Sequence, residues 1–283
     1  MKITADLNVL ALLKHPEEFY GDPQVDYLIQ FGPKFEGLIG KCENELPKDG
    51  VVILEHHYDE AKKLMDKINE LAQAVIGNAN KYDDVGFCQE YFELAKAGYR
   101  MLDKYDSKGG LPGALGLPGE CPVSLERAGL VTTRLALGLD KDAVIDNEVA
   151  VVTKRTHLID EPETNLSVTV KWREPDKLKT IDGREILLSD FVNPASGASG
   201  LAFVLAAKEL GIKPKQINHR SISLTRQGLV FVRQELDKLG IDSTFYSVGE
   251  CNELNKMYYL IGHRAVADAG HLLRHFLPKW YKQ

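Results

Sequence analysis

The chain has 283 residues, 44% of them hydrophobic and 27% charged, a composition typical of a soluble globular protein with a full core. Its formal net charge of −6 gives no general attraction to nucleic acid or to an anionic membrane. No apolar stretch approaches the roughly 20 residues of a membrane span, and the first residues do not resemble a secretory signal. We therefore expect a cytoplasmic protein whose partners are small molecules rather than nucleic acids or membranes.

The first fifty residues carry no recognisable motif. The apolar run at residues 7–14 predicts a helix, which Pro16 would limit in length. The Pro-Lys-Asp-Gly cluster at 47–50 is a turn and a reasonable domain boundary. The expected organisation is a helical N-terminal extension over 1–50, followed by a domain over 51–283.

Alternating strand and helix patterns follow this boundary. A short buried strand is expected at 51–54, and helical spacing of apolar residues recurs at 58–74 and 91–105. The Gly- and Pro-rich segment 107–119 predicts an exposed loop of the kind that covers a site. Further strands are expected at 149–152, 168–172, 186–188, 221–224 and 243–247, with helices at 201–210 and 227–239. This alternation favours an α/β fold, a parallel sheet flanked by helices, whose ligands bind at the carboxyl ends of the strands.

Cysteine and histidine residues show no metal-binding pattern. The cysteines form no C-x-x-C pair, which predicts buried thiols rather than a disulfide framework or a zinc site. The histidines likewise lack a tight spacing with Cys or Glu. The cysteines are Cys42, Cys88, Cys121 and Cys251.

The segment from Asp190 to Ser199 is the most informative part of the chain. An apolar strand ends in Asp190, turns through small hydroxyl and glycine residues, and enters a helix at Leu201. Small side chains let the backbone wrap closely around an oxyanion, and a helix start adds N–H groups and a positive dipole end. The segment therefore predicts a phosphate site, although the same residues also suit an ordinary strand-to-helix turn capped by Ser and Gly.

Five segments, in order and at similar spacing, resemble the uracil phosphoribosyltransferase branch of the type I phosphoribosyltransferases. They are the strand and histidines at 51–57, the Leu-Glu-Arg-Ala-Gly-Leu segment at 125–130, Arg155 with the Glu-Pro pair at 161–162, the bend at 190–199, and the closing segments at 254–255, 259–261 and 268–270. The resemblance implies a Rossmann-type fold and transfer of a phosphoribosyl group from phosphoribosyl pyrophosphate to uracil or a similar nucleobase. It also implies Mg²⁺ and a homodimer or larger assembly.

The resemblance also assigns residues to the parts of a site. The phosphoribosyl group would be held by Asp190, Asn193, Ala195, Ser196, Gly197, Ala198 and Ser199. Pyrophosphate would be held by Arg127 and Arg155, and the base by Tyr259, Leu260, Ile261 and Gly262, with Asp268 facing the ribose or the water shell of the metal. The residue types alone equally suit solvated arginines, core tyrosines and an aspartate cap.

The chain departs from the family pattern at two places. Counted from Asp190 to Ala195, the loop has one residue more than the family's loop; in the alternative alignment, Asn193-Pro194 replaces the family's Asp-Pro. The closing segment lacks the family's Pro-Gly, and His271 replaces its second aspartate. These departures leave the acceptor base open. They also leave open a non-catalytic nucleotide-binding regulator, or a hydrolytic or ribosyl-modifying enzyme of a biosynthetic pathway.

Overall fold

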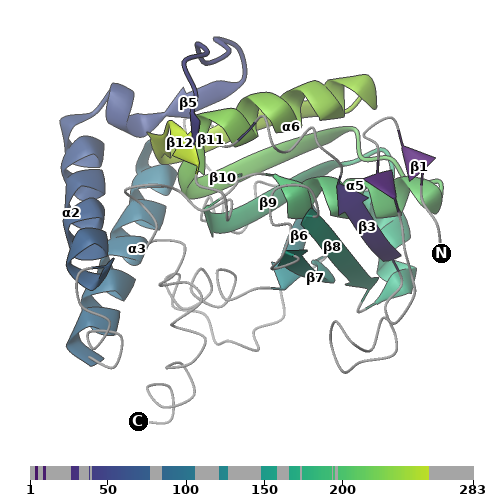
Figure 1. Ribbon diagram of the computed structural model, residues 1–283, viewed down its shortest axis with the longest axis horizontal. Helices are drawn as coiled ribbons and strands as arrows, with labels where there is room; N and C mark the ends of the chain where they lie inside the picture. Colours follow the sequence, from purple (N-terminus) through teal and green to yellow (C-terminus); the bar gives the residue numbers. More distant parts are fainter. Residues whose placement is uncertain are drawn as a thin grey trace.

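The computed structural model describes residues 4–5, 9–10, 27–31, 38, 40–76, 85–105, 121–126, 148–157, 166–172, 174–192, 194 and 197–254. Within these ranges the chain forms one large mixed sheet with helices packed against it, and a small two-stranded sheet (Figure 1).

Strands of the large sheet are, in chain order, β1 (Thr4–Ala5), β2 (Val9–Leu10), β3 (Tyr27–Phe31), β5 (Val51–Ile53), β6 (Cys121–Glu126), β7 (Val149–His157), β8 (Leu166–Trp172), β9 (Glu185–Val192), β10 (Gln216–Thr225) and β11 (Asp242–Cys251). Their order in space is β1-β2-β3-β8-β7-β6-β9-β10-β11-β5. From β7 through β6, β9, β10 and β11 to β5, each strand runs parallel to its neighbour. Beyond β7, the strands β8, β3, β2 and β1 pair antiparallel.

Two pairs of helices pack against the parallel strands. One pair is α2 (Asp59–Ile76) and α3 (Val85–Tyr105), which contact each other and β11. The other pair is α5 (Ala198–Glu209) and α6 (Arg226–Lys238), which also contact each other; α5 lies against β7 and β8, and α6 against β10 and β11. Two 3₁₀ segments, η2 (Leu54–His56) and η4 (Pro175–Ile181), complete the helical parts, and β4 (Gly40–Lys41) pairs with β12 (Glu253–Leu254).

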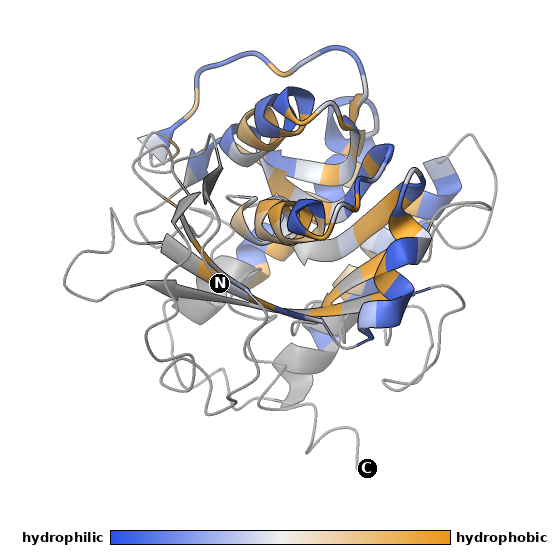
Figure 2. Ribbon diagram, turned by 90° about the vertical axis from the view of Figure 1, so that its right-hand side faces the viewer, coloured by the Kyte–Doolittle hydropathy of each residue, from blue (hydrophilic) through white to orange (hydrophobic). Residues whose placement is uncertain are grey.

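The core lies between the sheet and these helices (Figure 2). Helix α5 is buried almost all round, because residues 201–207 are each 2% exposed or less. Phe203 of α5 meets the ring of Trp172 edge-on, with ring centroids 5.9 Å apart, and Trp172 meets Tyr27 in the same way at 6.2 Å. Since Tyr27 belongs to β3, the first fifty residues contribute to the same core as the parallel strands.

The predicted α/β class is confirmed. The helices and strands that the sequence predicts between residues 51 and 247 all overlap elements of the structure. Strand β10 is buried along almost its whole length, as expected for a parallel strand covered on both faces. Strand β6 was not predicted as a strand, and β8 follows β7 as an antiparallel neighbour rather than through a helical crossover.

The helical character predicted for the N-terminal extension is wrong where the structure describes it. Residues Val9–Leu10, expected within a helix, form strand β2, which pairs with β1 and β3. A short, largely apolar run fits a buried strand as well as a helix, and pairing at the edge of the sheet decides between them. The domain boundary near residue 50 stays a prediction, and the loop at 107–119 lies outside the described residues.

Three of the four cysteines, Cys42, Cys121 and Cys251, are buried thiols outside any disulfide bond, as predicted. Burial raises the pKa of Cys121 and of Cys251, which favours the protonated thiol over the thiolate. The side chain of Cys88 lies outside the described residues.

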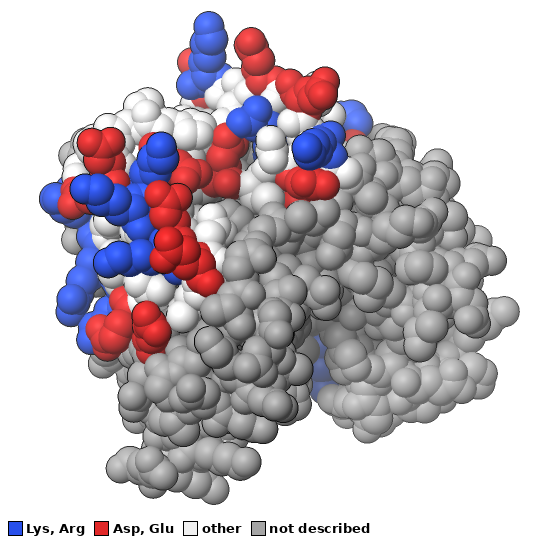
Figure 3. Space-filling view, turned by 60° about the vertical axis from the view of Figure 1, so that its left-hand side comes forward, with Lys and Arg blue, Asp and Glu red and all other residues white. Residues whose placement is uncertain are grey.

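The described surface in Figure 3 carries Lys and Arg interspersed with Asp and Glu, rather than a patch of one sign. None of the helices in the described ranges combines the length and the apolar character that a membrane span requires.

Candidate functional site

From β6 to β11, the chain changes the direction in which it adds strands to the sheet once. Counted along the chain from β6, the strands β8-β7-β6-β9-β10-β11 have the order 3-2-1-4-5-6, so successive strands are added on one side of β6 and then on the other. In open α/β sheets the ligand binds at such a switch point, outside the carboxyl ends of the strands. Here the switch point lies between β6, which ends at Glu126, and β9, which ends at Val192. These are the strands that lead into Arg127 and into the bend predicted to hold phosphate.

The bend after β9 is tightly held. Gly197 has φ 78°, in the left-handed region that favours glycine, and it begins α5 without any side-chain cap. The carbonyl of Pro194 accepts a hydrogen bond from the N–H of Thr225 at 2.8 Å. A Cβ atom on Gly197 would lie 2.0 Å from Cγ2 of Val232 on α6. The packing of α6 against the bend is therefore a second reason for glycine at position 197, besides the predicted approach of an oxyanion.

Ser199, in the first turn of α5, carries a hydroxyl that no described residue contacts through a hydrogen bond. The residue is 5% exposed, and its Oγ has no hydrogen-bond partner among the described residues. Buried polar atoms in folded proteins are nearly always hydrogen-bonded, so an unpartnered one calls for an explanation. A ligand with acceptor oxygens at the start of α5 would provide the missing partner.

The other predicted residues are described only in part. The backbone of Asp190 lies in β9, opposite Ser221 of β10, and the backbone of Arg155 lies in β7, opposite Val168 of β8. The side chains of Asp190 and Arg155 lie outside the described part of the structure. Outside the described residues are Arg127, Asn193, Ala195, Ser196, Tyr259, Leu260, Ile261, Gly262 and Asp268, whose roles stay predictions.

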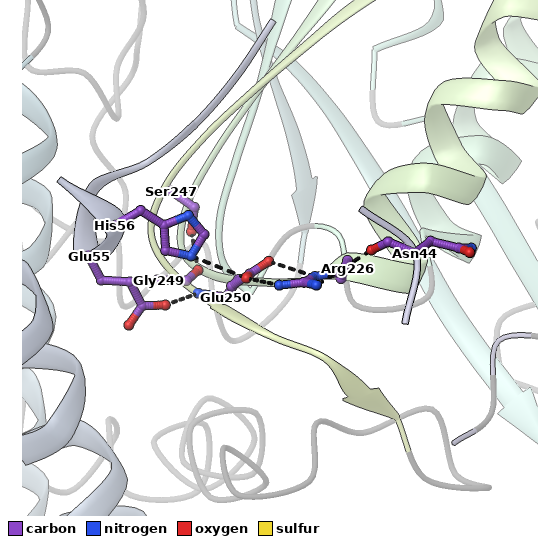
Figure 4. Close-up of polar contacts among 7 residues, drawn as sticks. All are labelled: Asn44, Glu55, His56, Arg226, Ser247, Gly249 and Glu250. Carbon is purple, nitrogen blue, oxygen red and sulfur yellow. Dashed lines mark hydrogen bonds and ion pairs between the residues drawn. The ribbon is translucent and has the colours of Figure 1, made fainter. Parts of the chain in front are cut away.

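A second polar group gathers at the carboxyl ends of β5 and β11 (Figure 4). Glu250 at the end of β11, with a side chain 9% exposed, receives two hydrogen bonds from Arg226: Nε donates to Oε2 at 3.2 Å, and Nη2 donates to Oε1. His56 Nε2 lies 3.2 Å from the same Oε1. The backbone N–H of Glu250 donates to Oε1 of Glu55 at 2.6 Å. One residue therefore fixes three side chains that come from η2 and α6.

The start of α6 also anchors the small sheet. Arg226 donates from Nη1 to the carbonyl of Asn44 at 3.4 Å. Gln227 donates from Nε2 to the carbonyl of Gly40, in β4, at 2.6 Å, and to the carbonyl of Asn252, just before β12, at 3.0 Å. The segment from Gly40 to Asn44 is thereby tied to the beginning of α6.

The sequence did not predict this second group. It singled out residues 51–57 only as a strand followed by histidines, and neither Arg226 nor Glu250 entered any motif. The available signal was positional: Thr225-Arg226 and Glu250 each stand where a predicted strand ends, at the edge of the sheet where ligands bind.

A buried histidine lies deeper in the same sheet. His219 of β10 is 3% exposed and stacks on Phe245 of β11, with ring centroids 4.5 Å apart. Neither ring nitrogen has a hydrogen-bond partner among the described residues. Burial lowers the pKa of His219 to about 3, so the ring is neutral at physiological pH.

No protein-family model matches the chain, and no curated protein matches it. Solved structures align with it at low identity. The AQ2163 protein from Aquifex aeolicus is 16% identical with a TM-score of 0.45, and the alignment covers 75% of this chain and 92% of that one. APRTase from Giardia lamblia, complexed with 9-deazaadenine, is 15% identical with a TM-score of 0.33, covering 61% and 83%.

Orotate phosphoribosyltransferase from Mycobacterium tuberculosis, in complex with phosphoribosyl pyrophosphate, is 13% identical with a TM-score of 0.34. That alignment covers 70% of this chain and 95% of the other. At these identities and TM-scores the likeness does not assign a function, which has to be inferred from the strand order and the residues of this chain.

Proposed function

We propose that the protein is a phosphoribosyltransferase, which transfers the phosphoribosyl group of phosphoribosyl pyrophosphate to uracil or a similar nucleobase. The observation that supports this most is the position of the switch point. The strands on its two sides, β6 and β9, lead into the two segments that resemble the pyrophosphate and phosphate segments of that family.

The bend after β9 would hold the 5-phosphate. Gly197 allows the backbone to turn in the left-handed conformation, and Ser199 offers a buried hydroxyl that lacks a partner. The first turn of α5 adds a positive dipole end. The neighbouring residues Asn193, Ala195, Ser196 and Ala198 would complete the phosphoribosyl site together with Asp190.

The pyrophosphate would lie on the other side of the switch point. Strands β6 and β7 are parallel neighbours, and Arg127 comes directly after β6 while Arg155 lies in the second half of β7. A guanidinium binds phosphate oxygens through two parallel hydrogen bonds and keeps its charge at any physiological pH. These two arginines would stabilise the charge that develops as pyrophosphate leaves.

Magnesium would enter with the donor. The described residues contain no group of three His, Cys, Asp or Glu side chains that could hold a metal ion. Mg²⁺ commonly binds substrate phosphates, keeps several waters and uses only one or two carboxylates of the protein. When bound, the ion would neutralise part of the charge on the pyrophosphate, with Asp268 the residue predicted to face its water shell or the ribose.

The acceptor would bind against Tyr259, Leu260, Ile261 and Gly262. These residues follow β12 along the chain, so they come after the carboxyl end of β11. The altered closing segment is the reason to extend the acceptor class beyond uracil to related nucleobases.

The test is incubation of the protein with phosphoribosyl pyrophosphate, Mg²⁺ and a panel of purine and pyrimidine bases, with pyrophosphate and nucleotide measured together. Equal amounts of pyrophosphate and nucleotide with one class of base are the expected result. Tight binding of the donor or of a nucleotide without turnover would instead identify a regulator, the alternative to which Asn193 points. Release of free base or ribose phosphate from a nucleotide would identify a hydrolytic enzyme.

A further inference from the structure

Glu55 stands just after β5 with one carboxylate oxygen engaged and the other not. Its Oε1 accepts the hydrogen bond from the backbone N–H of Glu250 (Figure 4), whereas Oε2 has no hydrogen-bond partner within the described ranges. Because Glu250 holds the carboxylate in place, Oε2 is a fixed acceptor at the carboxyl edge of the sheet, where ligands of such folds bind.

The surroundings of Glu55 favour proton uptake. Burial is the largest influence and raises the pKa of Glu55, and the carboxylates of Glu250 on β11 and Asp66 on α2 act in the same direction. The N–H of Glu250 and the imidazole of His56 act in the opposite direction. The charge of Glu250 is itself balanced by Arg226. A carboxyl group whose pKa lies above its ordinary range is suited to act as a general base near neutral pH.

The proposed reaction needs a base at this edge. When the sugar is transferred, the bond from C1 to the pyrophosphate oxygen breaks, and its electron pair leaves with pyrophosphate. A bond forms between C1 and a ring nitrogen of the acceptor, and that nitrogen loses its proton. Resting on the proposed function, we infer that Glu55 is the catalytic base, with Oε2 receiving the proton from the N–H of the acceptor. The acceptor is therefore a nitrogen heterocycle whose reacting nitrogen carries a hydrogen.

The strand order places Glu55 on the acceptor's side of the site. Glu250 ends β11, which is separated from β9 by β10 alone, and two strand spacings amount to about 10 Å. A ligand whose phosphate lies at the bend after β9 would extend across β10 toward Glu55. The residues predicted to bind the base follow from the same end of β11.

The test is Glu55→Gln, assayed with the donor and the accepted base across pH. Glutamine retains an oxygen that accepts the N–H of Glu250, so the fold is expected to persist, and thermal unfolding checks this. We expect kcat to fall about 100-fold or more, while KM for the donor stays within twofold. The decline of wild-type kcat at low pH, which protonation of Glu55 causes, is expected to disappear. Glu55→Asp, which keeps a carboxylate, is expected to recover part of the rate.

Glu185→Gln is the matched control, because Glu185 begins β9 at the amino edge of the same sheet and pairs only loosely with Lys215, at 3.5 Å. It is expected to leave kcat and its pH profile unchanged. Wild-type kcat and an unchanged low-pH decline in a folded Glu55→Gln protein would overturn the inference while leaving the transferase intact. If the wild-type protein forms no nucleotide with any base, the proposed function fails, and the role of Glu55 fails with it.

Discussion

Strands β9 and β10 each run into a helix at the same edge of the sheet, and the two junctions are completed differently. At the end of β10, Thr225 caps α6: its side-chain oxygen accepts the N–H of Gly228 at 2.9 Å. At the end of β9, Gly197 begins α5 and has no side chain with which to cap it. The hydroxyl of Ser199, in the first turn of α5, is buried without a partner among the described residues.

On the proposed function, this difference separates a structural junction, at the start of α6, from the junction proposed to bind the ligand, at the start of α5. At the start of α6 the side-chain donors are engaged within the protein, since Arg226 holds Glu250 and Nε2 of Gln227 holds the small sheet, while Oε1 of Gln227 is buried without a partner among the described residues. At the start of α5, the Ser199 hydroxyl has no hydrogen-bond partner among the described residues. Both junctions offer a helix dipole, so the dipole does not distinguish them; the unpartnered hydroxyl of Ser199 is what favours the start of α5 as the proposed phosphate site.

Gly197→Ala gives the largest expected effect, because it disturbs the contact between the two junctions. A left-handed alanine costs about 1–2 kcal/mol, and the clash with Val232 adds about 1–3 kcal/mol, so the free energy of unfolding should fall by roughly 2–5 kcal/mol. Urea denaturation measures this. Gly211→Ala is the control: it has φ 74° at the other end of α5 but nothing within 4 Å, so only the backbone cost of about 1–2 kcal/mol is expected. Equal losses in both variants would contradict the packing of α6 against the bend.

The loss of folding stability at low pH is expected to arise in part from β10, the strand that leads into α6. His219 of β10 has a folded-state pKa of about 3, below its ordinary value of 6.5, so the unfolded chain takes up the proton first and stability falls as pH falls through 6.5 toward 3. Between pH 7.5 and pH 5 this amounts to roughly 2 kcal/mol. In His219→Phe, which can keep the stacking on Phe245, this part of the pH dependence should vanish. Identical pH slopes of unfolding free energy for variant and wild type would refute the assignment.

Thr225→Ala tests the structural junction itself. Loss of the cap leaves the N–H of Gly228 without its acceptor, and the free energy of unfolding should fall by about 1 kcal/mol. Affinity for ribose 5-phosphate, measured by calorimetry, should not change. Thr225→Ser, which keeps the hydroxyl, should recover most of the stability.

Ser199→Ala is the counterpart at the ligand-binding junction and has the smallest expected effect on stability. No intramolecular bond is lost among the described residues, so the free energy of unfolding should change by less than about 0.5 kcal/mol. The dissociation constant for ribose 5-phosphate should rise about tenfold, the equivalent of one hydrogen bond. A stability loss like that of Thr225→Ala, with unchanged affinity, would make the two junctions equivalent.

The sequence could predict features that depend on a short segment, but not contacts between residues far apart in the chain. The parallel strands other than β6, and their helices, follow from local apolar patterns, and the bend at Gly197 follows from a local run of small residues. Strands β1 and β2 have two residues each, too few for any period to show. The pair of Arg226 with Glu250 joins positions 24 residues apart, and the bond from Glu250 to Glu55 joins positions 195 apart. Such contacts exist only once the strand order brings β5, β10 and β11 together.

The most direct test of the central claim is a crystal structure of the protein with phosphoribosyl pyrophosphate and Mg²⁺. We expect the 5-phosphate at the bend between Pro194 and Ser199, with backbone N–H groups and the Ser199 hydroxyl within hydrogen-bonding distance. A donor phosphate bound at the start of α6 or at a remote surface, with the bend after β9 empty, would contradict it.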